Sequence, residues 1–81
     1  MFVPSAAQQH RRRRVVGIDP GLTRCGYAVI ERSHNAAVSL SLGVIRTSAT
    51  DDLADRLLAL RDDIAELLDE FTPDVVAIER V

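Results

Sequence analysis

Two short apolar stretches, each with one carboxylate at its end, decide how this 81-residue chain is expected to fold. Residues 15–21 read VVGIDPG and residues 74–81 read DVVAIERV, which places Asp19 and Glu79 at the ends of two Val/Ile runs. Buried strands read as continuous runs of this kind, and an acid inside one costs free energy unless it has a partner. The sequence therefore predicts two strands that each carry a functional acid.

A divalent metal is the partner that both acids could share. If the two strands are neighbours, their backbones lie ~4.8 Å apart and the carboxylates can face each other. Like charges that close resist joint ionisation unless a cation lies between them. Hard oxygen ligands of this type indicate a hard divalent cation such as Mg²⁺, and hence phosphate chemistry.

Small residues beside both acids favour the metal site over simpler explanations. Side chains alternate along a strand, so Gly17 shares a face with Asp19, and Ala77 shares a face with Glu79. Taken singly, Asp19 could merely begin an Asp-Pro-Gly turn, and Glu79 could be a strand-end residue that reaches solvent. The matching small neighbours make the joint metal site the better interpretation.

Composition bounds the remaining possibilities. The chain is 47% hydrophobic and 27% charged, which is typical of one small globular domain. The single cysteine, Cys25, excludes an internal disulfide and fits a packed thiol in a reducing compartment. No stretch approaches the ~20 apolar residues of a membrane span, and no secretory signal precedes the first charges. We therefore expect a soluble, cytoplasmic protein with no membrane partner.

Charge is unevenly distributed along the chain. The net charge is −2, but from Val15 onward six Arg oppose twelve acids, and residues 51–70 hold eight acids against two Arg. A nucleic-acid partner must therefore contact the sheet edge or the strand ends, and not the acidic segment.

Periodicity divides the chain into elements. Residues 1–14, which end in four Arg, show no periodicity and are expected to form a disordered leader before a domain at residues 15–81. Strands are expected near 15–19, 25–32 and 38–46, and a type II turn at Pro20–Gly21, with Gly21 at positive φ, would join the first two. These three strands should form an antiparallel meander.

A helix and a fourth strand complete the pattern. One apolar stripe predicts a helix whose stripe packs in the core: Leu53, Leu57, Leu60, Ile64, Leu67 and Phe71. Thr50 is the expected N-cap, with Asp51 and Asp52 in the first turn, and Pro73 should help to end the helix. Residues 75–79 read as a strand covered on both faces, parallel to the first strand through a right-handed crossover. The fold class is α/β and ribonuclease H-like, and one helix leaves the other sheet face uncovered, so we expect an incomplete fold.

Two motifs carry a resemblance to a known family. Residues 16–27, VGIDPGLTRCGY, and residues 73–81, PDVVAIERV, resemble the RuvC family of bacterial Holliday-junction resolvases, and the similarity extends over residues 15–81. The resemblance implies a homodimeric, magnesium-dependent endonuclease with two ions per complete active site. Such enzymes cut four-way junction DNA during recombination and repair, together with the RuvA–RuvB branch-migration complex.

The resemblance also assigns the two acids. Asp19 matches the family's first catalytic carboxylate and Glu79 its second, which implies that both bind Mg²⁺. The family's two further carboxylates lie on a C-terminal helix beyond the matched motifs, and no counterpart occurs in these 81 residues. We therefore expect a truncated portion that is inactive on its own.

Three alternatives remain open. The RuvC-like nuclease segment of a CRISPR effector begins with a similar strand and Asp, although its motifs are spread over a far longer chain. Actin-like ATPases also place a glycine-rich hairpin after a strand Asp, but Pro20 removes one of the N–H donors that would hold phosphate. A non-catalytic ribonuclease H-like scaffold is disfavoured because both acids are present.

Overall fold

A computed structural model describes residues 12–79 of the chain. The expectations for residues 1–11 of the leader and for residues 80–81 lie outside these described residues. In chain order the elements are β1 (Arg13–Asp19), β2 (Arg24–Ser33), β3 (Ala36–Arg46), α2 (Leu53–Phe71) and β4 (Val75–Ile78).

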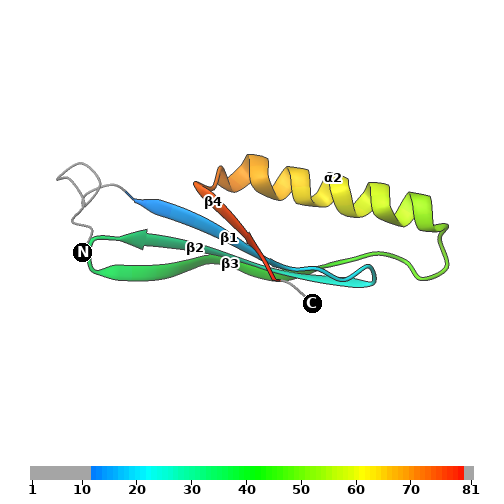
Figure 1. Cartoon of the computed structure of the whole chain (residues 1–81), viewed down its shortest axis with the longest axis horizontal. Coiled ribbons are helices and arrows are strands. Elements are labelled where there is room, and N and C mark those ends of the chain that lie inside the picture. Colours follow the sequence, from blue (N-terminus) through cyan, green and yellow to red (C-terminus); the bar gives the residue numbers. More distant parts are fainter. Residues whose placement is uncertain (1–11, 80–81) are drawn as a thin grey trace.

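The four strands form one mixed sheet in the order β3-β2-β1-β4 (Figure 1). β1 pairs antiparallel with β2, β2 pairs antiparallel with β3, and β4 pairs parallel with β1. The expected meander, crossover helix and parallel fourth strand are therefore confirmed. Because β4 returns beside β1, the two acid-bearing strands of the sequence are neighbours.

β1 begins two residues earlier than expected. Arg13 pairs with Arg32 and Arg14 pairs with Glu31 in the β1–β2 ladder, so both arginines belong to the sheet and not to the leader. The Arg14 guanidinium also forms an ion pair with Glu31, with 2.8 Å between Nε and Oε2. The opposite charge of Glu31 favours Arg14 in the strand, whereas Arg13 faces another arginine.

The core lies between the sheet and α2. Val16, Cys25 and Val29 are almost fully buried, together with Ile18 and, from the helix, Leu67. The buried position of Cys25 agrees with the expected packed thiol. α2 covers one face of the sheet only, as expected (Figure 1).

The helix stripe enters the core only in part, which corrects the prediction. Leu60, Ile64 and Phe71 pack against the core, but Leu53 and Leu57 remain 60% and 50% exposed. The N-terminal turns of α2 extend toward the β1–β2 turn, beyond the reach of β4, so little of the sheet lies beneath them (Figure 1). The apolar period identified the face of the helix correctly, but not how much of the sheet lies beneath it.

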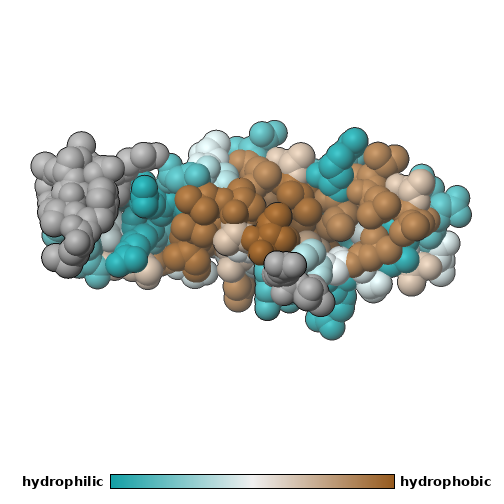
Figure 2. Space-filling model, in the orientation of Figure 1, coloured by the Kyte–Doolittle hydropathy of each residue, from teal (hydrophilic) through white to brown (hydrophobic). Residues whose placement is uncertain are grey.

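β4 differs most from its prediction. A strand covered on both faces was expected at residues 75–79, but β4 is an edge strand and all four of its residues are exposed. Its side chains contribute to the apolar surface that Figure 2 shows over β4 and along α2. Among the described residues nothing packs on its outer edge, which is why a run of buried-strand composition remains in contact with solvent.

The start of α2 is also corrected. Its N-cap is Asp52, which makes no side-chain capping bond, whereas the Thr50 hydroxyl lies 2.8 Å from Ser48 Oγ. The helix ends at Thr72, whose backbone is left-handed and whose N–H bonds the Leu68 carbonyl, immediately before Pro73. Within residues 12–79 no helix is long and apolar enough to cross a membrane.

Candidate active site

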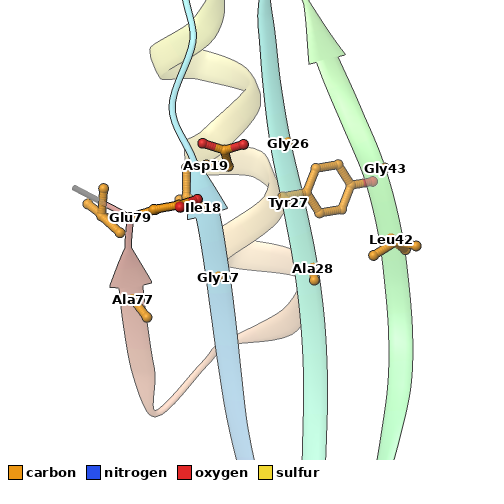
Figure 3. A pocket seen from close by; sticks show the side chains of 11 residues that line it. Gly17, Ile18, Asp19, Gly26, Tyr27, Ala28, Leu42, Gly43, Ala77 and Glu79 are labelled. Atoms are coloured by element: carbon orange, nitrogen blue, oxygen red, sulfur yellow. The ribbon is translucent and has the colours of Figure 1, made fainter. Parts of the chain in front are cut away.

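Asp19 and Glu79 come together at one end of the sheet. The parallel register pairs Ile18 with Ile78, and the Glu79 amide then donates to the Ile18 carbonyl at 2.9 Å. This bond continues the ladder past β4 and places Glu79 beside Asp19. Figure 3 shows both side chains at the same end of β1 and β4, as the sequence predicted.

Space beside the two acids was predicted and is present. Gly17 and Ala77 are partners in the β1–β4 register, and a Cβ built on Gly17 meets nothing within 4 Å. Both residues line a pocket of about 540 Å³ that Asp19 and Glu79 also line (Figure 3). The small residues thus keep open a space large enough for a ligand next to the carboxylates.

β2 adds a third small residue that sequence reasoning did not assign to the site. Gly26 pairs with Asp19, and a Cβ on Gly26 would lie 3.7 Å from the Asp19 Cβ. Asp19 therefore projects from the uncovered face of the sheet, on the side that Gly26 and Ala28 share. The alternation of strand 2 already placed Gly26 and Ala28 on one face, but only the register identifies the face that carries Asp19.

The turn after Asp19 has a different shape from the one predicted. No glycine among the described residues has positive φ, so the expected type II turn at Pro20–Gly21 is wrong. Gly21 is required for space instead, because a Cβ there would collide with the carbonyl oxygen of Arg24. The chain folds tightly against itself immediately after the carboxylate.

Arg56 and Thr47, which lie outside the turn, form hydrogen bonds to it. Thr47 Oγ1 donates to the Leu22 carbonyl at 2.5 Å, and the Thr47 amide donates to the Thr23 carbonyl at 3.3 Å. Arg56, on the first turns of α2, donates to Thr47 Oγ1 at 3.2 Å and to Thr23 Oγ1 at 2.9 Å. We call Arg56, Thr47 and Thr23 the turn brace. It connects α2 and the end of β3 to the segment that follows Asp19.

Arg14 forms hydrogen bonds that fix the backbone at the other end of β4, where this strand begins. Its amide donates to Asp74 Oδ2 at 2.8 Å, and its carbonyl accepts from the Asp74 amide at 2.9 Å. Its guanidinium donates to the Phe71 carbonyl at 2.9 Å, which is one of the free carbonyls at the helix end. These contacts fix where β4 begins and therefore which residue reaches the position beside Asp19.

Sequence reasoning missed Arg14 and the turn brace for the same reason. Their partners lie far along the chain, from Phe71 to Arg14 and from Arg56 to Thr23, so no local pattern reveals them.

The two carboxylates provide oxygen donors of the type that Mg²⁺ prefers. Both are exposed, and among residues 12–79 neither accepts a hydrogen bond or ion pair from a side chain, so their oxygens are available. The described residues contain no group of three or more metal-ligand side chains. The donors fit a hard cation, and Mg²⁺ commonly completes its shell with water and substrate phosphate.

Comparison with known proteins agrees with this arrangement. A family model described as crossover junction endodeoxyribonuclease RuvC matches residues 15–81. The RuvC of Corynebacterium efficiens is 52% identical over 73 residues, which is 89% of this chain and 33% of that protein. The RuvC of Cutibacterium acnes is 44% identical over 82 residues, 100% of this chain and 42% of that protein.

Solved structures agree as well. A Thermus thermophilus RuvC in complex with a Holliday junction substrate superposes with a TM-score of 0.78 at 32% identity, covering 84% of this chain and 42% of that one. A second Thermus thermophilus RuvC structure gives 0.77 at 31% identity. The ribonuclease H-like fold is thereby confirmed, and the chain spans about a third to two fifths of the curated relatives described above.

Proposed function

The chain belongs to the crossover junction endodeoxyribonuclease RuvC family, and we propose that it carries two of the catalytic carboxylates of a metal-dependent endonuclease. The observation that carries this proposal is the register of β1 and β4, which aligns Asp19 with Glu79 at one end of the sheet. The proposed activity is that of a protein of the relatives' full length that carries this sequence, called the family-length protein below.

Asp19 and Glu79 are the proposed ligands of two Mg²⁺ ions. Bound there, the metal would lower the pKa of attacking water and stabilise charge on the leaving oxygen of a phosphodiester. Two carboxylates are too few to hold both ions, so further ligands must come from the rest of the family-length protein, from water or from substrate.

The chain's own residues supply position and space. The β1–β4 ladder holds Asp19 and Glu79 at a fixed separation, and the turn brace restrains the segment that follows Asp19. Gly17, Gly26 and Ala77 leave room for a phosphate to approach the carboxylates from the uncovered sheet face. Such pre-positioning lowers the entropic part of the barrier.

The proposed substrate is four-way junction DNA, which the resolvase resemblance implies and the Thermus thermophilus complex contains. The proposed partners are a second copy of the family-length protein and the RuvA–RuvB branch-migration complex, in the cytoplasm. The 81-residue chain alone is proposed to be inactive, because it provides only part of the ligand set.

The alternatives are less well supported. A continuous family match over residues 15–81 favours a resolvase over the dispersed motifs of a CRISPR effector. The tight turn after Asp19 contains Pro20 and is held by side-chain hydroxyls, which disfavours the phosphate-binding hairpin of an actin-like ATPase.

The proposal is tested by cleavage of a four-way junction and of a linear duplex with the same sequence, each with Mg²⁺ and with EDTA. The family-length protein should cut the junction in paired positions, only with metal, and leave the duplex largely intact. Equal cleavage of both substrates, or binding of ATP without cleavage, would contradict the proposal.

A further inference from the structure

Two arginines stand directly opposite each other near the carboxylates. Arg24 of β2 pairs with Arg46 of β3 in the antiparallel register, and both side chains are exposed. Among the described residues no carboxylate lies within ion-pair distance of either one, whereas Arg12 and Arg14 share Glu31 and Arg61 meets Asp62. We call Arg24 and Arg46 the arginine pair.

The arginine pair is unfavourable for the fold as it stands. Like charges directly opposite each other destabilise an antiparallel pair of strands. The chain has twelve acids, eight of them in residues 51–70, and none of the described ones forms an ion pair with Arg24 or Arg46. An anion from outside the chain would relieve it.

The register places the arginine pair on the same sheet face as the catalytic acids. Asp19 pairs with Gly26, Gly26 pairs with Val44, and the two arginines lie two residues further along β2 and β3. Side chains two residues apart share a face, so both arginines project from the face that carries Asp19. At ~3.4 Å per residue they stand roughly 7 Å along the sheet from the position opposite Asp19.

We propose that Arg24 and Arg46 together bind a backbone phosphate of the nucleic-acid strand that passes the Asp19–Glu79 site. The guanidinium group is planar and always charged, and it matches phosphate oxygens through two parallel hydrogen bonds. Two such groups beside an acidic pair would hold a neighbouring phosphate while the carboxylates face the one to be cut. The inference rests on the proposed function and adds the residues that orient the strand.

A second opposed pair gives a matched control. Arg13 and Arg32 also pair across the sheet on the uncovered face, but at the opposite end from the acids. Replacing Arg32 by Gln changes the net charge of the protein, and the charge on the uncovered face of the sheet, by the same amount as replacing Arg24 by Gln. The control pair joins β1 and β2 and the arginine pair joins β2 and β3, and only the arginine pair lies at the end of the sheet that carries the acids.

The test measures binding of the family-length protein to a four-way junction in EDTA across a range of salt concentrations. Arg24→Gln and Arg46→Gln should each make the slope of log K against log salt less steep, by up to about 0.9, the value expected for the loss of one phosphate contact. Arg32→Gln and Arg61→Gln should leave the slope unchanged. Because repulsion is relieved, Arg24→Gln should unfold at the same temperature as the wild type or at a higher one.

The outcomes separate this inference from the proposed function. A wild-type protein that neither binds nor cuts the junction would overturn the proposed function. A wild type that binds and cuts, with unchanged slopes for Arg24→Gln and Arg46→Gln, would overturn the phosphate contact alone. An equal fall in slope for Arg32→Gln would show diffuse attraction and would overturn the local contact.

Discussion

The Glu79 amide donates to the Ile18 carbonyl at 2.9 Å, and this one bond extends the β1–β4 ladder past the last residue of β4. It brings Glu79 level with Asp19, although 60 residues separate the two acids in the sequence. Within residues 12–79 the edge strand β4 pairs with a neighbouring strand, β1, on its inner side only. Contacts that fix the start of β4, and those that fix the turn after Asp19, therefore determine the geometry of the pair.

We expect Gly17 to lower the stability of β1 while leaving space beside Asp19. Its backbone is not left-handed and a Cβ there meets nothing within 4 Å, so Gly17→Val should stabilise the strand by about 0.5–1 kcal/mol. The same side chain would fill the space beside Asp19 and should reduce junction cleavage at least tenfold. Thermal unfolding and cleavage rates of the family-length protein give both values.

Gly43→Ala is the control for a glycine that has no room for a side chain. Its methyl group would lie 2.8 Å from the Tyr27 hydroxyl oxygen, so this variant should be less stable than the wild type. If Gly17→Val cleaves at the wild-type rate, the space beside Asp19 is not used by substrate.

The turn brace should restrain the backbone after Asp19. Arg56→Lys cannot bond both Thr47 Oγ1 and Thr23 Oγ1 in the same fork geometry, so the Thr47 amide, which donates to the Thr23 carbonyl, should exchange with solvent roughly tenfold faster. Junction cleavage should fall while junction binding in EDTA stays unchanged. Arg61→Lys, which loses only an exposed contact to Asp62, is the control. Unaltered exchange of the Thr47 amide in Arg56→Lys would exclude the restraint.

Arg14 should stabilise the start of β4. Arg14→Met removes the bonds to Glu31 Oε2 and to the Phe71 carbonyl, and we expect a loss of about 1–2 kcal/mol because the site is partly exposed. Urea unfolding of the family-length protein measures it, with Arg61→Met expected to change the free energy of unfolding by less than about 0.5 kcal/mol. Equal stability of the two variants would show that the guanidinium contacts are not formed in solution.

The acidic surface of α2 should face away from DNA. Replacing Asp62 and Asp63 by Arg removes repulsion toward phosphate, so non-specific affinity for linear duplex should rise while the preference for a junction does not improve. Competition binding between the two DNAs measures the preference. A collapse of junction preference itself would place the helix in the specific interface.

Local pattern was sufficient for the elements and for the placement of Asp19 and Glu79 at the same end of the sheet. Val/Ile runs, a stripe of period 3.6 and turn residues predicted three strands, a helix and a parallel fourth strand, and Gly17 and Ala77 marked the open side of the site. These features depend on neighbours within a few residues, which is the range that sequence periodicity reports.

The exposure of β4 and the contacts of Arg14, Thr47 and Arg56 were not predictable in this way. Val75 and Val76 have the composition of a buried strand, yet burial depends on what lies beside them, and within the described residues only β1 pairs with β4, on its inner edge. The arginine contacts link segments that are 9 to 60 residues apart, so they follow from the register and not from any local pattern.

The most direct test compares Asp19→Asn, Glu79→Gln and the double variant of the family-length protein in junction cleavage with Mg²⁺ and in junction binding with EDTA. Both substitutions preserve shape and remove one charge, so folding and binding should persist, and binding should strengthen slightly as repulsion falls. Each single variant should lose orders of magnitude in cleavage rate, since losing a metal ligand costs several kcal/mol of transition-state stabilisation. If the two acids act as one site, the double variant should be no slower than the slower single variant. Near-normal cleavage by either single variant would remove that residue from the site, and multiplied losses in the double variant would show that the two acids act separately.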